Sequence, residues 1–147
     1  MTEFKRLTDT MYVASQLSSD DIARAVQDGF TVLINNRPDG EGEGQPTANE
    51  LRDTAEAHHV QYHHIPVGAG GFSMPQIEQM SQAIDRPGNK TLAFCRSGTR
   101  STLLWALARA KKGESIDAIT HSASAAGYDV KAMRPTMELL ARPDPGA

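Results

Sequence analysis

Residues 91–101 read Thr-Leu-Ala-Phe-Cys-Arg-Ser-Gly-Thr-Arg-Ser, and this stretch decides the fold class and the expected chemistry. The apolar run at its start is typical of a buried strand, and residues 102–112 have the composition of a helix. The one cysteine of the chain, Cys95, therefore lies where a strand passes into a helix. Strand–loop–helix units of this kind are typical of α/β proteins with a parallel sheet.

The loop after Cys95 contains the groups that favour a thiolate. Its backbone N–H groups and the start of the following helix carry partial positive charge, and Arg100 adds a full charge with a planar set of donors. The thiolate is the nucleophilic form of cysteine. A buried cysteine that only packs is the alternative, but two arginines, two hydroxyl side chains and a glycine follow it directly. We therefore predict that Cys95 is a catalytic nucleophile in an anion-binding loop.

The remaining chain alternates strand and helix patterns before Cys95 and has only helix patterns after it. This order predicts an α/β fold with a central, mostly parallel sheet of four to five strands, helices on its faces and an all-helical carboxyl-terminal part. We expect one domain over residues 1–147, with a frayed tail at residues 142–147. Strands are predicted at residues 11–14, 30–34, 60–67 and 91–95, and helices at 18–27, 47–58, 73–84, 102–112, 115–126 and 134–141.

Three predicted loops follow strands, at residues 35–45, 68–72 and 95–100. Because the carboxyl ends of parallel strands meet at one edge of a sheet, we expect these loops to converge on the site. The first loop offers Arg37, Asp39 and Glu41 for substrate binding or as a substitute acid. Turn chemistry, or a simple pair between Arg37 and Asp39, is the alternative. His64, near the end of the predicted strand 60–67, is a candidate neighbour of the site.

The composition narrows the classes of function. A net charge of −3 does not favour nucleic acid or an anionic membrane as a partner, and no apolar run is long enough for a spanning helix. A reactive lone thiol needs a reducing compartment and the amino terminus lacks a signal-peptide core, so we expect a cytoplasmic location. No cofactor is expected, and no metal site, since adjacent histidines on a strand point to opposite faces.

The pattern Cys-x-x-Gly-x-Arg-Ser resembles two families. Cysteine-dependent protein phosphatases place the arginine six positions after the cysteine, and rhodanese-type sulfur transferases often have a loop one residue shorter, as here. The helices after the loop are similar to those of a small dual-specificity phosphatase. Residues 32–41, 64–67 and 95–101 make the whole chain resemble the bacterial domain that is fused to a dioxygenase part in beta-lactamase-hydrolase-like proteins. This resemblance implies a dual-specificity-phosphatase-like three-layer fold with a sulfur-transfer loop.

The short loop favours sulfur chemistry over phosphate chemistry. A phosphoryl group needs donors for three oxygens, whereas a persulfide is a single anionic atom. Dual-specificity phosphatases also carry an aspartic acid on the loop after the preceding strand, and residues 68–73 contain no acid. We therefore predict a sulfur transferase. The alternatives are a cysteine-dependent tyrosine or dual-specificity-type phosphatase and a non-catalytic anion-binding module.

The sulfur-transfer hypothesis assigns a role to each residue of the loop. Cys95 takes sulfur from a small anionic donor such as thiosulfate, and a thiol acceptor, with glutathione as the candidate, removes it. Ser101 is expected to donate a hydrogen bond to the cysteine sulfur, and a sulfur dioxygenase is the partner that the resemblance implies. The loop residues that bind the persulfide or the donor are Arg96, Ser97, Gly98, Thr99 and Arg100.

Overall fold

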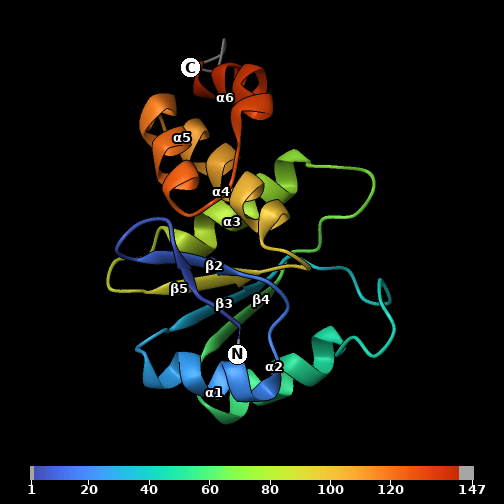
Figure 1. The fold of residues 1–147 in the computed structure, drawn as a ribbon. Coiled ribbons are helices and arrows are strands. Elements are labelled where there is room, and N and C mark those ends of the chain that lie inside the picture. Colours follow the sequence, from blue (N-terminus) through green and yellow to red (C-terminus); the bar gives the residue numbers. More distant parts are fainter. Residues whose placement is uncertain (1, 143–147) are drawn as a thin grey trace.

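The computed structural model describes residues 2–142, which form a five-stranded sheet between two layers of helices (Figure 1). The strand order is β1-β2-β5-β3-β4; β1 runs antiparallel to β2, and all other neighbours are parallel. The elements are β1 (Lys5–Arg6), β2 (Met11–Ala14), α1 (Ser19–Gln27), β3 (Val32–Asn35), α2 (Ala48–Ala57), β4 (Gln61–His64), α3 (Met74–Ile84), β5 (Thr91–Phe94), α4 (Thr99–Lys111), α5 (Ile116–Ala125), a 3₁₀ turn (Lys131–Met133) and α6 (Arg134–Ala141).

The two central strands, β3 and β5, are buried on both faces. Successive side chains of a strand point to opposite faces, so Val32 and Ile34 join one apolar core and Leu33 joins the other. Strands that are covered on both sides need continuous apolar sequence rather than an alternating pattern. This requirement explains why the apolar runs before residues 35 and 95 form the middle of the sheet.

Helices α1 and α2 cover one face of the sheet (Figure 1). Both begin with capping boxes. The Ser18 side chain accepts the N–H of Asp21, whose carboxylate accepts the N–H of Ser18 in return, and Thr47 and Glu50 form the same pair at α2. These local bonds define where the two helices start.

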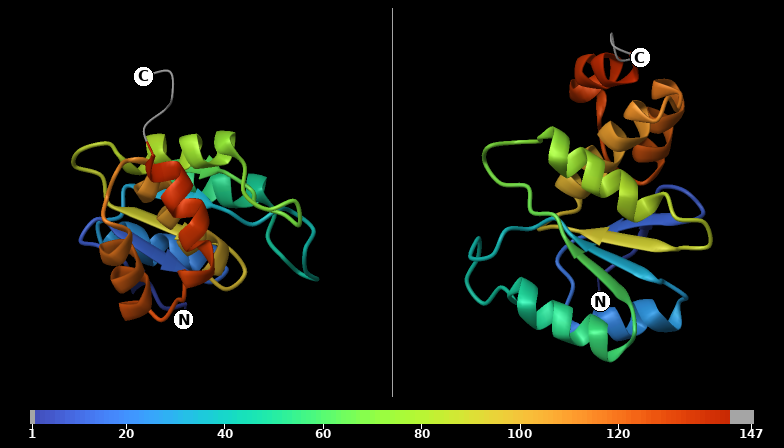
Figure 2. Two further views of the ribbon diagram at one scale, coloured as in Figure 1. Left: turned by 90° about the horizontal axis from the view of Figure 1, so that it is seen from above. Right: turned by 180° about the vertical axis from the view of Figure 1, so that it is seen from behind.

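Helices α3 and α4 cover the other face, with α5 and α6 outside them (Figure 2, right). Helix α4 packs against α3, α5 and α6. It is buried on nearly all sides, with Trp105 and Leu107 in the core. A helix with this much buried surface is held rigidly, and it therefore gives a fixed support to the residues of its first turn.

The predicted α/β architecture is confirmed, with one additional strand and with three elements whose bounds differ by more than one residue. Strand β1 was not expected, because two polar residues give no periodic signal. Strands β3 and β4 are shorter than the runs at 30–34 and 60–67 suggested, and α4 begins three residues earlier than predicted. Residues 143–147, most of the tail that was expected to fray, lie outside the described residues. No helix within residues 2–142 is long and apolar enough to cross a membrane.

Candidate active site

Cys95 follows directly on β5, in the middle of the sheet's carboxyl edge. The loops that follow β3 and β4 lie at this same end of the sheet (Figure 1), as expected from the topology. The sulfur of Cys95 accepts a hydrogen bond from the backbone N–H of Gly98, at 3.1 Å. The residue has no exposed surface. The sulfur of this candidate nucleophile is therefore enclosed by its surroundings.

Gly98 gives the loop its tight shape. Its φ of +90° lies in the left-handed region, where side chains other than hydrogen are disfavoured. A Cβ at this position would lie 2.2 Å from the hydroxyl oxygen of Tyr128, which donates a hydrogen bond to the carbonyl of Ser97 at 3.0 Å. The carbonyl of Gly98 accepts the hydroxyl of Thr102 at 2.8 Å. The turn therefore has room only for glycine.

The sulfur lies at the amino-terminal end of α4, because Gly98 is the N-cap of that helix. The partial positive charge of a helix start favours an anion there. Of the other predicted loop residues, Arg96 is exposed, and the hydroxyls of Ser97 and Thr99 are hydrogen-bonded to each other at 3.0 Å. Arg96 is therefore free to meet an incoming anion, whereas the two hydroxyls stiffen the loop.

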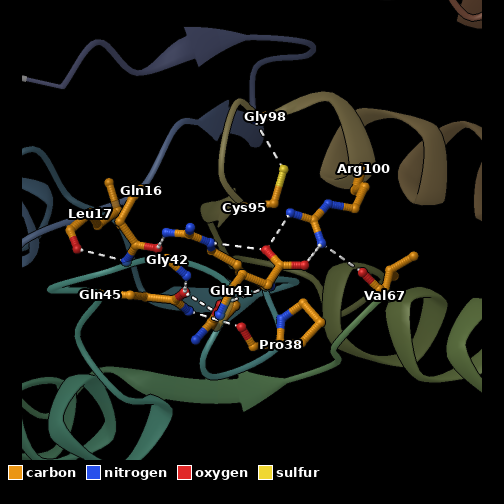
Figure 3. Close-up of polar contacts among 12 residues, drawn as sticks. Gln16, Leu17, Pro38, Glu41, Gly42, Gln45, Val67, Cys95, Gly98 and Arg100 are labelled. Carbon is orange, nitrogen blue, oxygen red and sulfur yellow. Dashed lines mark hydrogen bonds and ion pairs between the residues drawn. The ribbon is translucent and has the colours of Figure 1, made fainter. Parts of the chain in front are cut away.

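Arg100 lies in the first turn of α4 and is held by two loops from elsewhere in the chain (Figure 3). Its Nη1 donates to Oε2 of Glu41 at 2.7 Å and to the carbonyl of Val67 at 2.8 Å, and its Nη2 donates to Oε1 of Glu41 at 2.8 Å. The hydrogen bond to Glu41 is the main cause that raises the pKa of Arg100, and the charge of Cys95 is a smaller cause. The guanidinium therefore lies close to the sulfur.

Glu41 joins Arg100 to a second arginine. Arg37 is 7% exposed, and its Nε donates to Oε1 of Glu41 at 3.0 Å while its Nη1 donates to the Gln16 side chain at 3.0 Å. The hydrogen bond from Arg100, followed by that from Arg37, lowers the pKa of Glu41 to about 2 against partial burial. Glu41 is therefore a carboxylate at neutral pH.

Residues 38–45 are held in shape by Gln45. Its side-chain oxygen accepts the N–H groups of Glu41 and Gly42 at 3.0 and 3.1 Å, and its amide nitrogen donates to the Pro38 carbonyl at 2.9 Å (Figure 3). A Cβ on Gly42 would lie 2.8 Å from Nη2 of Arg37. The turn thus packs closely against Arg37 and brings Glu41 to Arg100.

Ser101 does not have the role that the sequence suggested. Its buried hydroxyl donates to the side-chain oxygen of Asn36 at 2.8 Å instead of to the sulfur of Cys95. Asn36 also donates through its side chain to the Ile65 carbonyl at 2.9 Å and through its backbone N–H to the Phe94 carbonyl at 2.8 Å. Ser101 therefore joins α4 to the ends of β3, β4 and β5.

Asp39 and His64 lie near the site, and the side chain of each makes a hydrogen bond with a backbone group. Oδ1 of Asp39 accepts the N–H of Ala48 at the start of α2, at 2.8 Å, so the suggested pair between Asp39 and Arg37 is wrong. Nε2 of His64 lies 3.0 Å from the Arg37 carbonyl, to which the ring N–H donates. Both residues thus position the loop that carries Glu41.

Sequence reasoning missed most of the partners that organise this site. Glu41 was noted as a loop carboxylate, but its bond to Arg100 was not foreseen, and Gln16, Asn36 and Tyr128 were not considered. Polar residues directly after an apolar strand are the one signal that pointed toward Asn36. Within residues 2–142, no group of three or more His, Cys, Asp or Glu side chains is arranged to hold a metal ion.

The fold and the site together define a class. A cysteine after the central strand of a parallel sheet, with its sulfur at the start of a buried helix and an arginine in the first turn, is the arrangement of a phosphatase-like α/β domain. Residues 3–112 match the family described as "Beta-lactamase hydrolase-like protein, phosphatase-like domain". The chain belongs to this family, as its sequence resemblance implied.

Curated relatives and solved structures agree with this assignment. Beta-lactamase hydrolase-like proteins from Agrobacterium fabrum and Xylella fastidiosa are 31% and 27% identical over 108 and 128 residues, or 74% and 84% of this chain. The matches cover only 25% and 29% of those longer proteins. A candidate phosphatase from Neisseria meningitidis is 34% identical, with a TM-score of 0.78 over 92% of this chain and 96% of that one.

A kinase associated phosphatase supports the fold alone. It is 16% identical, with a TM-score of 0.70 over 98% of this chain and 97% of that one. The dual-specificity-phosphatase-like fold expected from the sequence is therefore confirmed. The matching family is described as phosphatase-like and the Neisseria meningitidis protein as a phosphatase, and none of the four proteins is described as a sulfur transferase.

Proposed function

We propose that this chain hydrolyses phosphate monoesters through a covalent phosphocysteine at Cys95. The observation that carries the proposal is the 3.1 Å hydrogen bond from the Gly98 N–H to the sulfur, at the start of α4 and beside Arg100. A helix start and a guanidinium group at this position attract a dianion. Membership of a phosphatase-like family and the resemblance to the Neisseria meningitidis protein support phosphate as that dianion.

The reaction has two steps. The Cys95 thiolate attacks phosphorus, the bond from phosphorus to the ester oxygen breaks, and the leaving oxygen takes the electron pair. Loop N–H groups and Arg100 stabilise the charge that develops on the phosphoryl oxygens. Water then attacks phosphorus, the S–P bond breaks, and phosphate and the Cys95 thiolate are released.

Sulfur transfer is the second candidate, and the length of the loop favours it. Four residues separate Cys95 from Arg100, which leaves fewer N–H groups for three phosphoryl oxygens. The Cys95 thiolate would attack the outer sulfur of thiosulfate, and sulfite would leave with the electrons of the S–S bond. A thiolate acceptor would then take the sulfur from the Cys95 persulfide. A sulfur dioxygenase partner stays a prediction of this second candidate.

Parallel assays separate the two candidates. Hydrolysis of p-nitrophenyl phosphate and transfer from thiosulfate to glutathione are measured on the wild type and on Cys95→Ser, together with the mass of the trapped protein. We expect phosphate release, a phosphoryl group on Cys95, and a loss of at least about 10³-fold in kcat/KM for the variant.

Each of the other outcomes would support a different function. A gain of one sulfur atom on Cys95, with thiosulfate consumption and no phosphate release, would make the second candidate the function. If both activities are absent and the variant still binds phosphate or sulfate as the wild type does, the chain is an anion-binding module.

A further inference from the structure

Arg100 keeps one edge of its guanidinium free. An arginine side chain has five N–H donors in one plane, and three of them are bound by Glu41 and the Val67 carbonyl. Within residues 2–142, the Nε–H and the adjacent N–H of Nη2 donate to no oxygen atom, and the Cys95 side chain is the further group that interacts with the guanidinium. These two form a complete fork for two oxygens of an anion. A substrate can therefore bind Arg100 without displacing Glu41.

Glu41 consequently stays ion-paired while the reaction proceeds. Oε1 accepts from both Arg100 and Arg37, and Oε2 accepts from Arg100. A carboxylate held by two guanidinium groups has no proton to donate at neutral pH, and the low pKa of Glu41 agrees with this geometry. Glu41 therefore orients Arg100 and does not act as a general acid.

The other proton donors around the loop are also engaged. The Tyr128 hydroxyl donates to the Ser97 carbonyl, and the His64 ring donates to the Arg37 carbonyl. Asp39 accepts the N–H at the start of α2. The loop after β4, at residues 68–73, contains no carboxylic acid. Among the described residues, these three side chains and that of Glu41 are thus already bonded, and Glu43, on the same turn as Glu41, is exposed to solvent.

We propose that this site releases its leaving group as an anion, so that its substrates are phosphate esters of acidic alcohols, the aryl and phosphotyrosine class, and not alkyl phosphates. The proposal rests on the phosphatase function proposed above. When the P–O bond breaks, the phenolate takes the electron pair and is protonated afterwards by water. A phenol with a pKa of about 10 can leave in this way, whereas an alkoxide, being far more basic, needs a proton in the transition state.

A series of leaving groups tests the proposal. The ratio kcat/KM is measured for phenyl phosphates with electron-withdrawing to electron-donating substituents, and for glycerol phosphate and phosphoserine peptides. Because general acid catalysis contributes about 10²–10⁴-fold, we expect alkyl phosphates to react at least about 10²-fold more slowly than phenyl phosphate, with a steep decline across the phenyl series. Equal rates for aryl and alkyl esters would overturn the proposal. No hydrolysis of any ester would instead overturn the proposed function.

Two matched variants of one loop identify the source of any proton. Glu41→Gln should lower kcat/KM by the same factor, about tenfold or more, for every leaving group, since it loosens Arg100. Glu43→Gln removes an exposed carboxylate of the same loop and should change nothing. If either variant slows the poor leaving groups selectively, that residue is the acid and the inference is wrong.

Discussion

Two loops meet at the carboxyl edge of the sheet, and they are held together in different ways. The loop of residues 95–100 is closed by bonds between near neighbours, from Gly98 to the Cys95 sulfur and from Thr102 to Gly98. Residues 37–45 depend on partners far away in the chain, since Arg37 binds Gln16 and Glu41 binds a residue 59 positions on.

Because of this difference, the two loops contribute to the site in different ways. The short-range loop places the candidate nucleophile and the proposed anion site on a few consecutive residues, and a strand and a helix fix both of its ends. The long-range loop adds the group that orients Arg100. We infer that damage to the first loop removes the site itself, whereas damage to the second leaves the site present with its guanidinium loosely placed.

The largest effect on stability is expected from Gly98→Ala. A left-handed backbone costs an alanine about 1–2 kcal/mol, and overpacking against Tyr128 costs about 1–3 kcal/mol more. Gly113→Ala is the matched control, because Gly113 has φ +92° and nothing within 4 Å of the added Cβ. In urea unfolding, Gly98→Ala should lower the free energy of unfolding by about 2–5 kcal/mol. Gly113→Ala should lower it by the backbone cost alone, about 1–2 kcal/mol.

A double variant divides the Gly98 effect into its two causes. Adding Tyr128→Phe removes the hydroxyl at 2.2 Å and should recover part of the lost stability. Equal losses in Gly98→Ala and Gly113→Ala would mean that Tyr128 moves aside without cost, and the tight loop would then be less rigid than its contacts suggest.

Ser101→Ala should have the next largest effect. It leaves the buried Asn36 oxygen without its donor, at a cost of about 1–3 kcal/mol in the free energy of unfolding. Ser97→Ala, on the exposed part of the loop, should stay within about 0.5 kcal/mol. A Ser101→Ala protein of unchanged stability but much lower kcat/KM would restore the role at the sulfur that the sequence suggested.

The smallest effect is expected for the pH dependence of the stability that Glu41 contributes. Its pKa of about 2 in the folded protein lies below the ordinary value of 4.5, so the ion pair stabilises the fold fully above pH 4.5 and loses that contribution as the pH falls toward 2. The side chain is 28% exposed, and screening limits the effect to about 1 kcal/mol. Denaturant unfolding of wild type and Glu41→Gln should therefore differ at pH 7 and converge near pH 2. If the difference in the free energy of unfolding between the two proteins stays constant from pH 7 to pH 2, the ion pair of Glu41 is not the cause of that difference.

Much of the fold could be predicted because its signals are local. Apolar runs marked the central strands, a serine at position 18 or 19 marked the start of the first helix, and Thr47 with Glu50 marked the start of the second. Helix α4 was placed three residues late, since Thr99 and Ser101 are typical of turns and the left-handed Gly98 decides where the helix begins. Strand β1 could not be found at all, because two residues form a strand only when β2 is there to pair with them.

The sequence by itself determined where the candidate nucleophile lies, which loop surrounds it and which arginine follows in the next helix. These residues interact over three to five positions, a range in which spacing alone specifies geometry. Only the tertiary structure decided which partner each side chain binds. Arg100 donates to the carboxylate of Glu41, and Ser101 donates to the side-chain oxygen of Asn36. Ion pairs and buried hydrogen bonds between distant residues leave no pattern in a single chain, because packing of the whole sheet and its helices brings their partners together.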